Sequence, residues 1–228
     1  MVKKLSNFTV VIRVKNEERW IGHSIQSVLD NLYKPEIIIV NNNSTDQSLE
    51  IVKRFSEDRN LKDNSTRNYT KIKIINLDSY TPGKSINLGI KESSNKYILV
   101  LSAHCVLRKI DINNLVSDID RYASVFGNQI PIWDGKKIIK RYLWSHFVNT
   151  KVINMYSDSE ERYFLHNAAS FFQRDFLLEN PFDEELQSKE DRYWAIDVIN
   201  KGFKILYDPS FEVEHHYTPN GATWKGLG

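Results

Sequence analysis

Short apolar runs alternate with amphipathic stretches through the first hundred residues of the chain. The apolar runs are rich in Val, Ile and Leu, as expected for buried strands. In the stretches between them, apolar residues recur every three or four positions, which is typical of helices with one buried face. This alternation predicts a parallel sheet covered by helices. The expected strands are residues 8–14, 37–40, 72–77 and 97–101, and the expected helices are residues 20–32, 49–55 and 83–90.

The second half of the chain has a less regular pattern. A polar stretch at residues 57–71 indicates a surface loop between the expected helix at 49–55 and the expected strand at 72–77. Residues 133–166 form a variable segment. The other elements expected there are helices at 113–123 and 190–201 and strands at 125–129, 167–173, 204–207 and 211–215. With 228 residues and no internal repeat, the chain fits one ordinary domain.

Composition narrows the class of protein. Hydrophobic residues make up 41% and charged residues 26% of the chain, which is ordinary globular usage. The net charge of +2 comes without a basic stripe, so we expect no nucleic-acid partner. The sequence has no apolar run of signal-peptide or membrane-span length, which predicts a cytoplasmic protein with at most peripheral membrane association. The single cysteine, Cys105, fits a reducing compartment and a place in the core.

Polar side chains follow all four strands of the predicted parallel sheet. Ligands bind at the carboxyl ends of strands in such sheets, so these residues are the first candidates for a site. Polar residues are common in any loop, but here four separate loops would meet at one edge. The candidates are Arg13, Lys15, Asn16 and Glu17 after the first strand, Asn41, Asn42 and Asp46 after the second, Lys84 and Asn87 after the third, and Ser102 and His104 after the fourth.

Two common nucleotide-binding motifs do not fit this chain. Residues 13–19 contain no glycine, which argues against the Gly-x-Gly-x-x-Gly loop of dinucleotide-binding oxidoreductases. Gly83-Lys84-Ser85 looks like the end of a P-loop, but Asp78 stands where the first glycine is required and Pro82 interrupts the loop. We interpret this second match as accidental.

Five motifs, taken in order, resemble family 2 glycosyltransferases of the GT-A fold. They are VIRVKNEE at residues 11–18, NNNSTD at 41–46, GKSINLG at 83–89, SAH at 102–104 and KEDRYW at 189–194. The resemblance implies an α/β fold with a mostly parallel nucleotide-binding sheet flanked by helices. It also implies one glycosyltransferase domain over residues 1–228, with a nucleotide-sugar-binding half at 1–105 and an acceptor-binding half at 106–228.

The same resemblance implies a donor nucleotide held by the loops at the carboxyl edge of the sheet. A lysine there supplies a point charge to a phosphate, and side-chain amides can bond to the edge of a base. The implied donor-binding residues are Arg13, Lys15, Glu17 and Asn42 around the nucleobase and ribose, Lys84 near the diphosphate, Asn87 in the third loop, and Ser102 near the sugar.

The chain departs from the family pattern at three places, and the departures leave the base and the metal open. The usual Pro-Thr-Tyr is Arg13-Val14-Lys15, which removes a stacking surface, and the usual paired aspartates are Asn41-Asn42. The usual metal-binding Asp-x-Asp is Ser102-Ala103-His104. Imidazole suits Mn²⁺ better than Mg²⁺.

Histidine also occurs at this position in some related GT-A enzymes, where a second ligand follows the last strand. That resemblance implies a divalent metal, Mn²⁺ rather than Mg²⁺, at His104 and His215, with diphosphate oxygens and water completing the site. The alternative is a neutral, hydrogen-bonding His104 in a metal-independent enzyme.

Glu190-Asp191 opens a predicted helix, whose first turn would direct both carboxylates toward the cleft. Aligned with the family, Asp191 is the catalytic base that takes the proton of the acceptor hydroxyl. The alternative is helix capping, which acids at a helix start often perform. Trp194, three residues on, could stack on a sugar ring or belong to the core.

The predicted activity is transfer of a sugar from a nucleoside-diphosphate donor to an acceptor hydroxyl, and the family implies inversion. The implied acceptor is a glycan or lipid-linked glycan of a bacterial polysaccharide or glycolipid pathway, at the inner face of the plasma membrane in the lipid-linked case. Residues 133–163, with aromatic and basic side chains, are the candidate acceptor surface. One alternative is a non-catalytic module that binds sugar nucleotides or glycans. A sugar nucleotidyltransferase is a weaker alternative, because the loop after the first strand lacks the glycines of that class.

Overall fold

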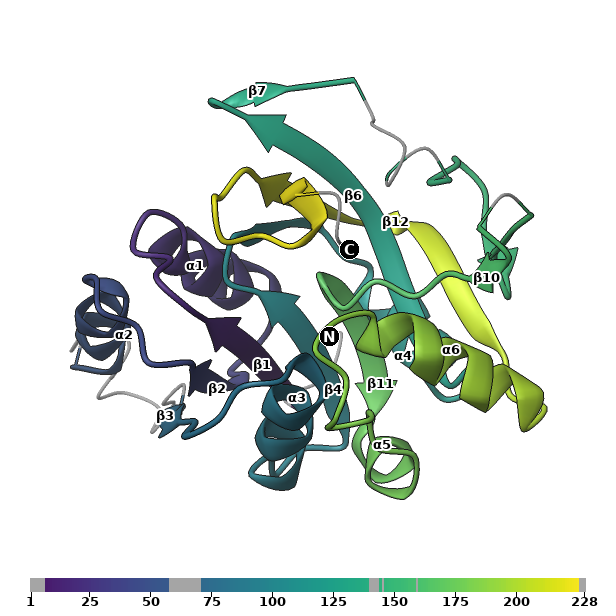
Figure 1. The fold of residues 1–228 in the computed structure, drawn as a ribbon, viewed down its shortest axis with the longest axis horizontal. Coiled ribbons are helices and arrows are strands. Elements are labelled where there is room, and N and C mark those ends of the chain that lie inside the picture. Colours follow the sequence, from purple (N-terminus) through teal and green to yellow (C-terminus); the bar gives the residue numbers. More distant parts are fainter. Residues whose placement is uncertain (1–6, 58–70, 140–143, 145, 159, 226–228) are drawn as a thin grey trace.

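The computed structural model describes residues 7–57, 71–139, 144, 146–158 and 160–225, which build one large sheet with helices on both faces (Figure 1). The helices are α1 (Ile21–Asn31), α2 (Ser48–Glu57), α3 (Pro82–Lys91), α4 (Ile112–Ile119), α5 (Arg174–Glu179) and α6 (Glu190–Asn200), with a 3₁₀ turn at Thr223–Lys225. The strands of the large sheet are β1 (Phe8–Val14), β2 (Glu36–Asn41), β3 (Ile72–Asn76), β4 (Tyr97–Ser102), β5 (Cys105–Lys109), β6 (Ser124–Trp133), β7 (Lys136–Lys137), β8 (Val152–Ile153), β11 (Ala169–Gln173) and β12 (Ile205–His216). A separate pair is formed by β9 (Tyr156–Ser157) and β10 (Arg162–Tyr163).

The first half of the chain confirms the predicted β-α alternation. Strands β1 to β4 are parallel and lie in the order β3-β2-β1-β4. Side chains of a strand alternate between the two faces of a sheet, so Val10 and Ile12 join one apolar cluster and Val11 joins the other. Because both faces are buried, β1 is a continuous apolar run rather than an alternating one.

Different helices cover the two faces of this sheet. Ile25 of α1 and Leu115 of α4 belong to the cluster on one face. Ile86 of α3 and Ala195 of α6 belong to the cluster on the opposite face. The sheet is therefore the middle layer of three, and its carboxyl edge is the part of each strand that the helices leave open to ligands.

Two glycines allow α3 to lie close to its neighbours. A Cβ at Gly89 would lie 2.4 Å from Cγ1 of Val11 in β1, and a Cβ at Gly83 would lie 2.1 Å from the carbonyl oxygen of Asp183. Both distances are far below van der Waals contact, so a side chain at either position would push α3 away. The start of α3 is thus fixed against the segment that precedes α6.

The second half extends the same sheet and corrects several sequence predictions. Strand β11 pairs antiparallel with β4 and β6, and β12 pairs parallel with β6. The two strands predicted at 204–207 and 211–215 are one strand, β12, whose register shifts between Asp208 and Glu212. The predicted strand at 167–173 begins at Ala169, and β5 and α5 were not predicted.

The helix predicted at 113–123 is α4 and ends at Ile119. The backbone N–H of Ala123 donates to the carbonyl oxygen of Lys204, which draws the chain into β6. Strand β6 in turn runs to Trp133, four residues beyond the prediction.

Two expected loops fall partly outside the described residues. Residues 58–70 of the polar loop lie there, as do 140–143, 145 and 159 of the variable segment. Within the described part of the chain, no helix is long and apolar enough to cross a membrane.

The pairing brings loops from both halves to one edge. Strand β11 runs opposite to β4, so its first residues lie beside the carboxyl end of β4, where the N–H of Ser102 donates to the carbonyl oxygen of Ala168. The end of β12 lies at the same edge, because His215 pairs with Cys105 and the N–H of His216 donates to the carbonyl oxygen of His104. Cys105 is fully buried, which confirms the prediction of a core residue.

Candidate active site

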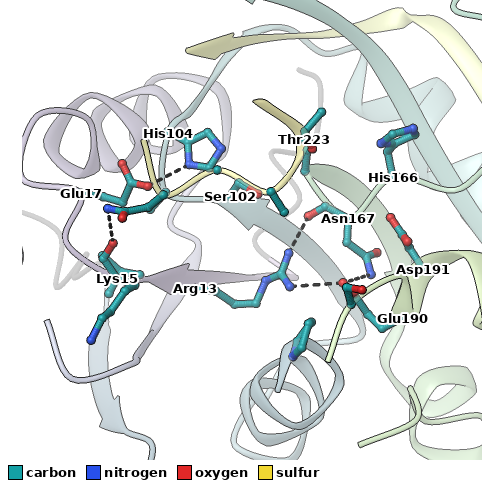
Figure 2. A pocket seen from close by; sticks show the side chains of 18 of the residues that line it. Arg13, Lys15, Glu17, Ser102, His104, His166, Asn167, Glu190, Asp191 and Thr223 are labelled. Atoms are coloured by element: carbon teal, nitrogen blue, oxygen red, sulfur yellow. Dashed lines mark hydrogen bonds and ion pairs between the residues drawn. The ribbon is translucent and has the colours of Figure 1, made fainter. Parts of the chain in front are cut away.

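A cavity of about 290 Å³ opens at this edge of the sheet (Figure 2). Its walls come from the loop after β1, the turn after β4, the segment before β11, the start of α6, and the chain after β12. The described residues that line it are Arg13, Val14, Lys15, Glu17, Tyr80, Pro82, Ser102, Ala103, His104, His166, Asn167, Ala168, Gln187, Ser188, Lys189, Glu190, Asp191, His215, Asn220, Gly221, Ala222 and Thr223.

Most of the predicted site residues meet in this cavity. Seven line it although they come from four separate segments of the chain. They are Arg13, Lys15, Glu17, Ser102, His104, Asp191 and His215. Their individual roles stay predictions.

The other three predicted residues lie outside the cavity lining. Lys84 directs its Nζ to Oγ of Ser79, 2.5 Å away, and the backbone N–H of Asn42 donates to the carbonyl oxygen of Val14. Asn87 is buried, and its amide donates to the carbonyl oxygen of Phe182 and to Glu184 while its Oδ1 accepts the N–H of Phe182. The side chain of Asn87 thus ties α3 to the segment before α6.

His215 has its protonation fixed by two buried neighbours. Oε1 of Gln129 accepts the indole N–H of Trp144 at 3.2 Å and lies 2.7 Å from Nδ1 of His215. An indole nitrogen is only a donor, so the atom facing it must be the amide oxygen. That oxygen in turn requires a proton on Nδ1 of His215. Burial also lowers the pKa of His215 well below its usual value, so the ring is neutral with its lone pair on Nε2.

His104 has the matching arrangement on the other side of the pair. Its Nδ1 lies 3.2 Å from Oε1 of Glu17, a carboxylate oxygen that also accepts the hydroxyl of Thr218. The proton of His104 therefore belongs on Nδ1 when the ring is neutral. Its Nε2 lies 3.1 Å from Nε2 of His215. With both rings neutral, two nitrogen lone pairs face each other across this short gap.

Such a pair of nitrogens fits a divalent metal ion. Imidazole nitrogens that bind one ion through bonds of about 2.1 Å at a right angle lie about 3 Å apart, close to the separation seen here. A hydrogen bond from the second nitrogen of each ring to a carboxylate or amide oxygen is the usual support of metal-binding histidines. Among the described residues no group of three or more His, Cys, Asp or Glu side chains could hold a metal. The protein itself would supply two ligands to the ion, the Nε2 atoms of His104 and His215.

The opposite wall of the cavity holds two adjacent carboxyl groups at the start of α6. The guanidinium group of Arg13 is paired with Glu190 at 3.3 Å and donates to the carbonyl oxygen of Asn167 at 3.3 Å (Figure 2). The amide of Asn167 donates to the same oxygen of Glu190 at 3.3 Å. Lys189, just before the pair, has the left-handed φ of 65°, which is strained for a residue with a side chain.

Asp191 differs from Glu190 in its partners. Burial raises the pKa of Asp191, against the lowering effects of the N–H of Arg192, its charge, and the N–H of Asn167. Burial and the charge of Asp191 raise the pKa of Glu190, against the effect of Arg13. Since Arg13 pairs with Glu190, Asp191 is the carboxyl group left to accept a proton. The N–H of Arg192 does donate to Asp191 at 2.9 Å, so a part in the first helical turn accompanies this placement.

Other residues of the region differ from the sequence interpretation or were missed by it. Trp194 is a core residue, since its ring stacks on Phe182 at 5.3 Å and its indole donates to the carbonyl oxygen of Asn180. None of the described residues in 133–163 lines the cavity. Tyr80 and the stretch 220–223 line it and were missed. Tyr80 follows the third predicted strand, so its position at a strand end was the available signal.

Comparison with known proteins agrees with this geometry. Residues 9–179 match the family described as Glycosyl transferase family 2. The chain belongs to glycosyltransferase family 2. The probable glycosyltransferase YdaM of Bacillus subtilis (strain 168) is 27% identical to this family 2 chain over 240 residues, which cover 98% of the chain and 53% of YdaM. The chain therefore spans about half the length of that relative.

Solved structures share the GT-A fold with this family 2 chain. TarS of S. aureus, in complex with UDP-GlcNAc, has a TM-score of 0.67 and 19% identity over 94% of the chain and 60% of the TarS chain. GalNAc-T7, in complex with UDP, GalNAc and Mn²⁺, has a TM-score of 0.71 and 17% identity over 96% of the chain and 45% of its own. The predicted α/β GT-A fold is confirmed.

Proposed function

We propose that this chain transfers a sugar from a nucleoside-diphosphate donor to an acceptor hydroxyl, with inversion at the anomeric carbon. The observation that carries the proposal is one cavity lined by both the carboxyl group of Asp191 and the facing Nε2 atoms of His104 and His215. A proton acceptor and a site for a charged leaving group thus lie in the same space.

The reaction assigned to Asp191 is general base catalysis. The acceptor oxygen attacks the anomeric carbon and its proton passes to the carboxylate of Asp191. The bond from the anomeric carbon to the diphosphate breaks on the opposite face, and the nucleoside diphosphate leaves with both bonding electrons. Arg13 supports this step indirectly, because its pairing with Glu190 keeps the neighbouring carboxylate neutralised.

His104 and His215 are the residues that would hold a divalent metal ion in this proposal, with Mn²⁺ favoured over Mg²⁺. When bound, such an ion neutralises charge on the departing diphosphate. GalNAc-T7 was solved with Mn²⁺, which supports the assignment of the ion by likeness of fold only. Glu17 and Gln129 orient the two rings.

The remaining assignments follow the family. Lys15, Glu17, Asn42 and Lys84 belong to the nucleotide side of the proposed site, and the halves 1–105 and 106–228 serve donor and acceptor respectively. The proposed acceptor is a glycan or lipid-linked glycan of a bacterial polysaccharide or glycolipid pathway, handled in the cytoplasm or at the inner face of the membrane. TarS is named as a poly(ribitol-phosphate) β-N-acetylglucosaminyltransferase of Staphylococcus aureus, so sugar transfer to a bacterial polymer has a precedent among the relatives.

The proposal is tested by measuring the release of nucleoside diphosphate. The assay uses a panel of UDP- and GDP-sugars with Mn²⁺ and candidate acceptors. Asp191→Asn should abolish release while nucleotide binding persists. Asp197→Asn is the matched control, because Asp197 is exposed on the same helix and paired with Lys201. Equal loss in both variants would contradict the role of Asp191.

A non-catalytic binding module is the second candidate function. This candidate is favoured because neutral side chains replace acids of the family at three positions, Asn41, Asn42 and Ser102. Binding of a nucleotide sugar without any release, unaffected by Asp191→Asn, would establish the module instead.

A further inference from the structure

The end of β6 and the whole of β7 form a hairpin at the outer margin of the molecule (Figure 1). Trp133 of β6 pairs with Lys136 of β7 across a two-residue turn. Both turn residues have positive φ angles, 48° and 72°, and such turns match the twist of the strands that they join. The pairing continues past β7, because the N–H of Ile138 donates to the carbonyl oxygen of Pro131. Residues 131–138 are therefore a hydrogen-bonded ribbon.

This ribbon and the residue after it expose two large apolar side chains and two lysines. Trp133 is 41% exposed and Ile139 is 92% exposed. Lys136 and Lys137 are both exposed, against one acid, Asp134, in the turn. The sequence continues with two more basic residues, at positions 140 and 141, which lie outside the described residues. Single exposed apolar side chains are common, but an isoleucine almost entirely in water near an exposed tryptophan is typical of an interaction surface.

The hairpin extends from the edge of the sheet at which the cavity opens. In the parallel pairing of β12 with β6, His215 of the cavity lies opposite Pro131. Trp133 is two residues further along β6, so the turn lies just beyond the level of the cavity. Trp224, which follows the cavity-lining Thr223, packs on Trp133 with ring centroids 5.9 Å apart. A partner that contacts the hairpin would therefore lie beside the cavity.

Apolar and basic side chains together fit the surface of an anionic lipid bilayer. Tryptophan favours the interface between water and hydrocarbon, and an aliphatic side chain such as Ile139 leaves water when it enters that interface. A lysine keeps its ammonium group at the headgroups, where anionic lipids attract it.

Other partners fit this surface less well. A soluble polyanion would attract the lysines but leave the isoleucine in water. A stable protein interface buries about 800 Å² on each partner. A ribbon two strands wide offers only a narrow line of contact, which suits insertion between lipid headgroups better.

We propose that the β6–β7 hairpin and Ile139 dock the protein on an anionic lipid bilayer. Trp133 and Ile139 enter the headgroup layer, and Lys136 and Lys137 contact the anionic headgroups. The inference rests on the proposed function, because a docked bilayer would hold a lipid-linked acceptor at the edge of the sheet where the cavity opens. It goes further by naming the surface and the lipid charge.

Sedimentation with lipid vesicles tests the surface without a sugar donor or acceptor. The full chain is mixed with vesicles of phosphatidylcholine alone, or of phosphatidylcholine and phosphatidylglycerol in equal parts. The variant Ile139→Ser removes the apolar contact, and the double variant Lys136→Glu/Lys137→Glu reverses the charge.

The matched controls change exposed residues away from the hairpin. Ile153→Ser lies in β8, where Ile153 is 49% exposed and pairs with Leu206 near the start of β12, at the other end of that strand from the hairpin. The double variant Lys53→Glu/Lys204→Glu makes the same change of charge with two exposed lysines.

We expect the parent to bind the mixed vesicles at least about tenfold more tightly than phosphatidylcholine alone, because each lysine near an anionic surface typically strengthens binding about fivefold. Ile139→Ser should bind the mixed vesicles about tenfold more weakly, since one aliphatic side chain no longer leaves water. The double lysine variant should lose the preference for mixed vesicles, and both controls should bind like the parent. Every variant should melt at the parent's temperature, because the changed residues are exposed.

Several results would overturn the docking surface. They are a parent that does not bind the mixed vesicles, equal binding by the parent and Ile139→Ser, and equal losses in the hairpin variants and their controls. A dimeric parent that Ile139→Ser converts to a monomer in gel filtration would assign the surface to a second copy of the chain instead. Failure of the proposed function looks different, because vesicle binding would persist while no UDP- or GDP-sugar released its nucleoside diphosphate.

Discussion

Asp191 has a partly buried carboxyl group, and its neighbours oppose the effect of that burial on its pKa. Its pKa is raised by burial although Arg192 and two backbone N–H groups act to lower it. Arg13, which also lines the cavity, is paired with Glu190. Adjacent acids of the same helical turn thus have different electrostatic partners, and only one is free to take a proton.

The pH dependence of transfer should report this raised pKa. A base works only when deprotonated, so the rate should fall as pH falls through the pKa of Asp191, and the acid limb should lie above the usual aspartate value of about 3.9. Initial rates of nucleotide release under saturating substrate measure it. A rate that stays flat down to about pH 4 would contradict the raised pKa.

The stability of Asp191→Asn should show the same shift with a definite sign. A folded-state pKa above the unfolded value means that the folded protein loses stability as pH rises through it. The amide removes that loss, so the variant should melt at a higher temperature than the parent near pH 8, and the difference should shrink near pH 4. Thermal unfolding at both pH values measures it. A variant less stable than the parent at both would contradict the assignment.

Strand β6 and the residue Trp144 act on the metal site through a single amide. Gln129 of β6 bonds to the indole of Trp144 and to His215 of β12, so three parts of the chain fix one imidazole. Outer partners of this kind typically change metal affinity by about tenfold to a hundredfold when removed. The orientation of His215 thus depends on β6 and Trp144 as well as on its own strand.

Gln129→Leu should therefore weaken Mn²⁺ binding about tenfold or more, because His215 loses the acceptor that fixes its tautomer. Isothermal titration of the nucleotide-loaded protein with Mn²⁺ measures this. Gln173→Leu is the matched control, since Gln173 lies at the far end of β11 and bonds to Ile119 and Asp120. Equal Mn²⁺ affinity in the parent and in Gln129→Leu would contradict the coupling.

Helix α3 depends on the absence of side chains at its close contacts. Gly83→Ala should lower the free energy of unfolding by about 1–3 kcal/mol, because the new Cβ would meet the carbonyl oxygen of Asp183. Gly22→Ala in α1 is the control, since its Cβ would lie 3.3 Å from a side-chain carbon of Ile51, which can move. Denaturant unfolding measures both. Similar losses in the two variants would show that the α3 contact is not special.

At the scale of the whole molecule, local sequence pattern predicted the elements that bury a regular face. The four apolar runs from 8–14 to 97–101 became β1 to β4, and the polar residues predicted at the ends of β1 and β4 reached the cavity. Asn87 also follows a predicted strand but does not reach the cavity, because its amide donates to the carbonyl oxygen of Phe182 and its Oδ1 accepts the N–H of the same residue.

Long-range contacts account for what the sequence left undecided. Strand β5 is five residues long and is held by its pairing with β12, about a hundred residues further along. The bond from Thr218 to Glu17 joins residues 201 positions apart. Neither leaves a periodic pattern in the sequence, so the closing of the cavity by 220–223 could be found only in three dimensions.

The central claim is that one cavity gathers the leaving group, the ion and the base. Crystals grown with Mn²⁺ and the preferred nucleoside diphosphate test it directly through the anomalous signal of manganese. The ion should lie between Nε2 of His104 and Nε2 of His215, with diphosphate oxygens completing its shell and the Asp191 carboxyl group facing the same space. Manganese held by other residues, or a nucleotide bound outside this cavity, would contradict the claim.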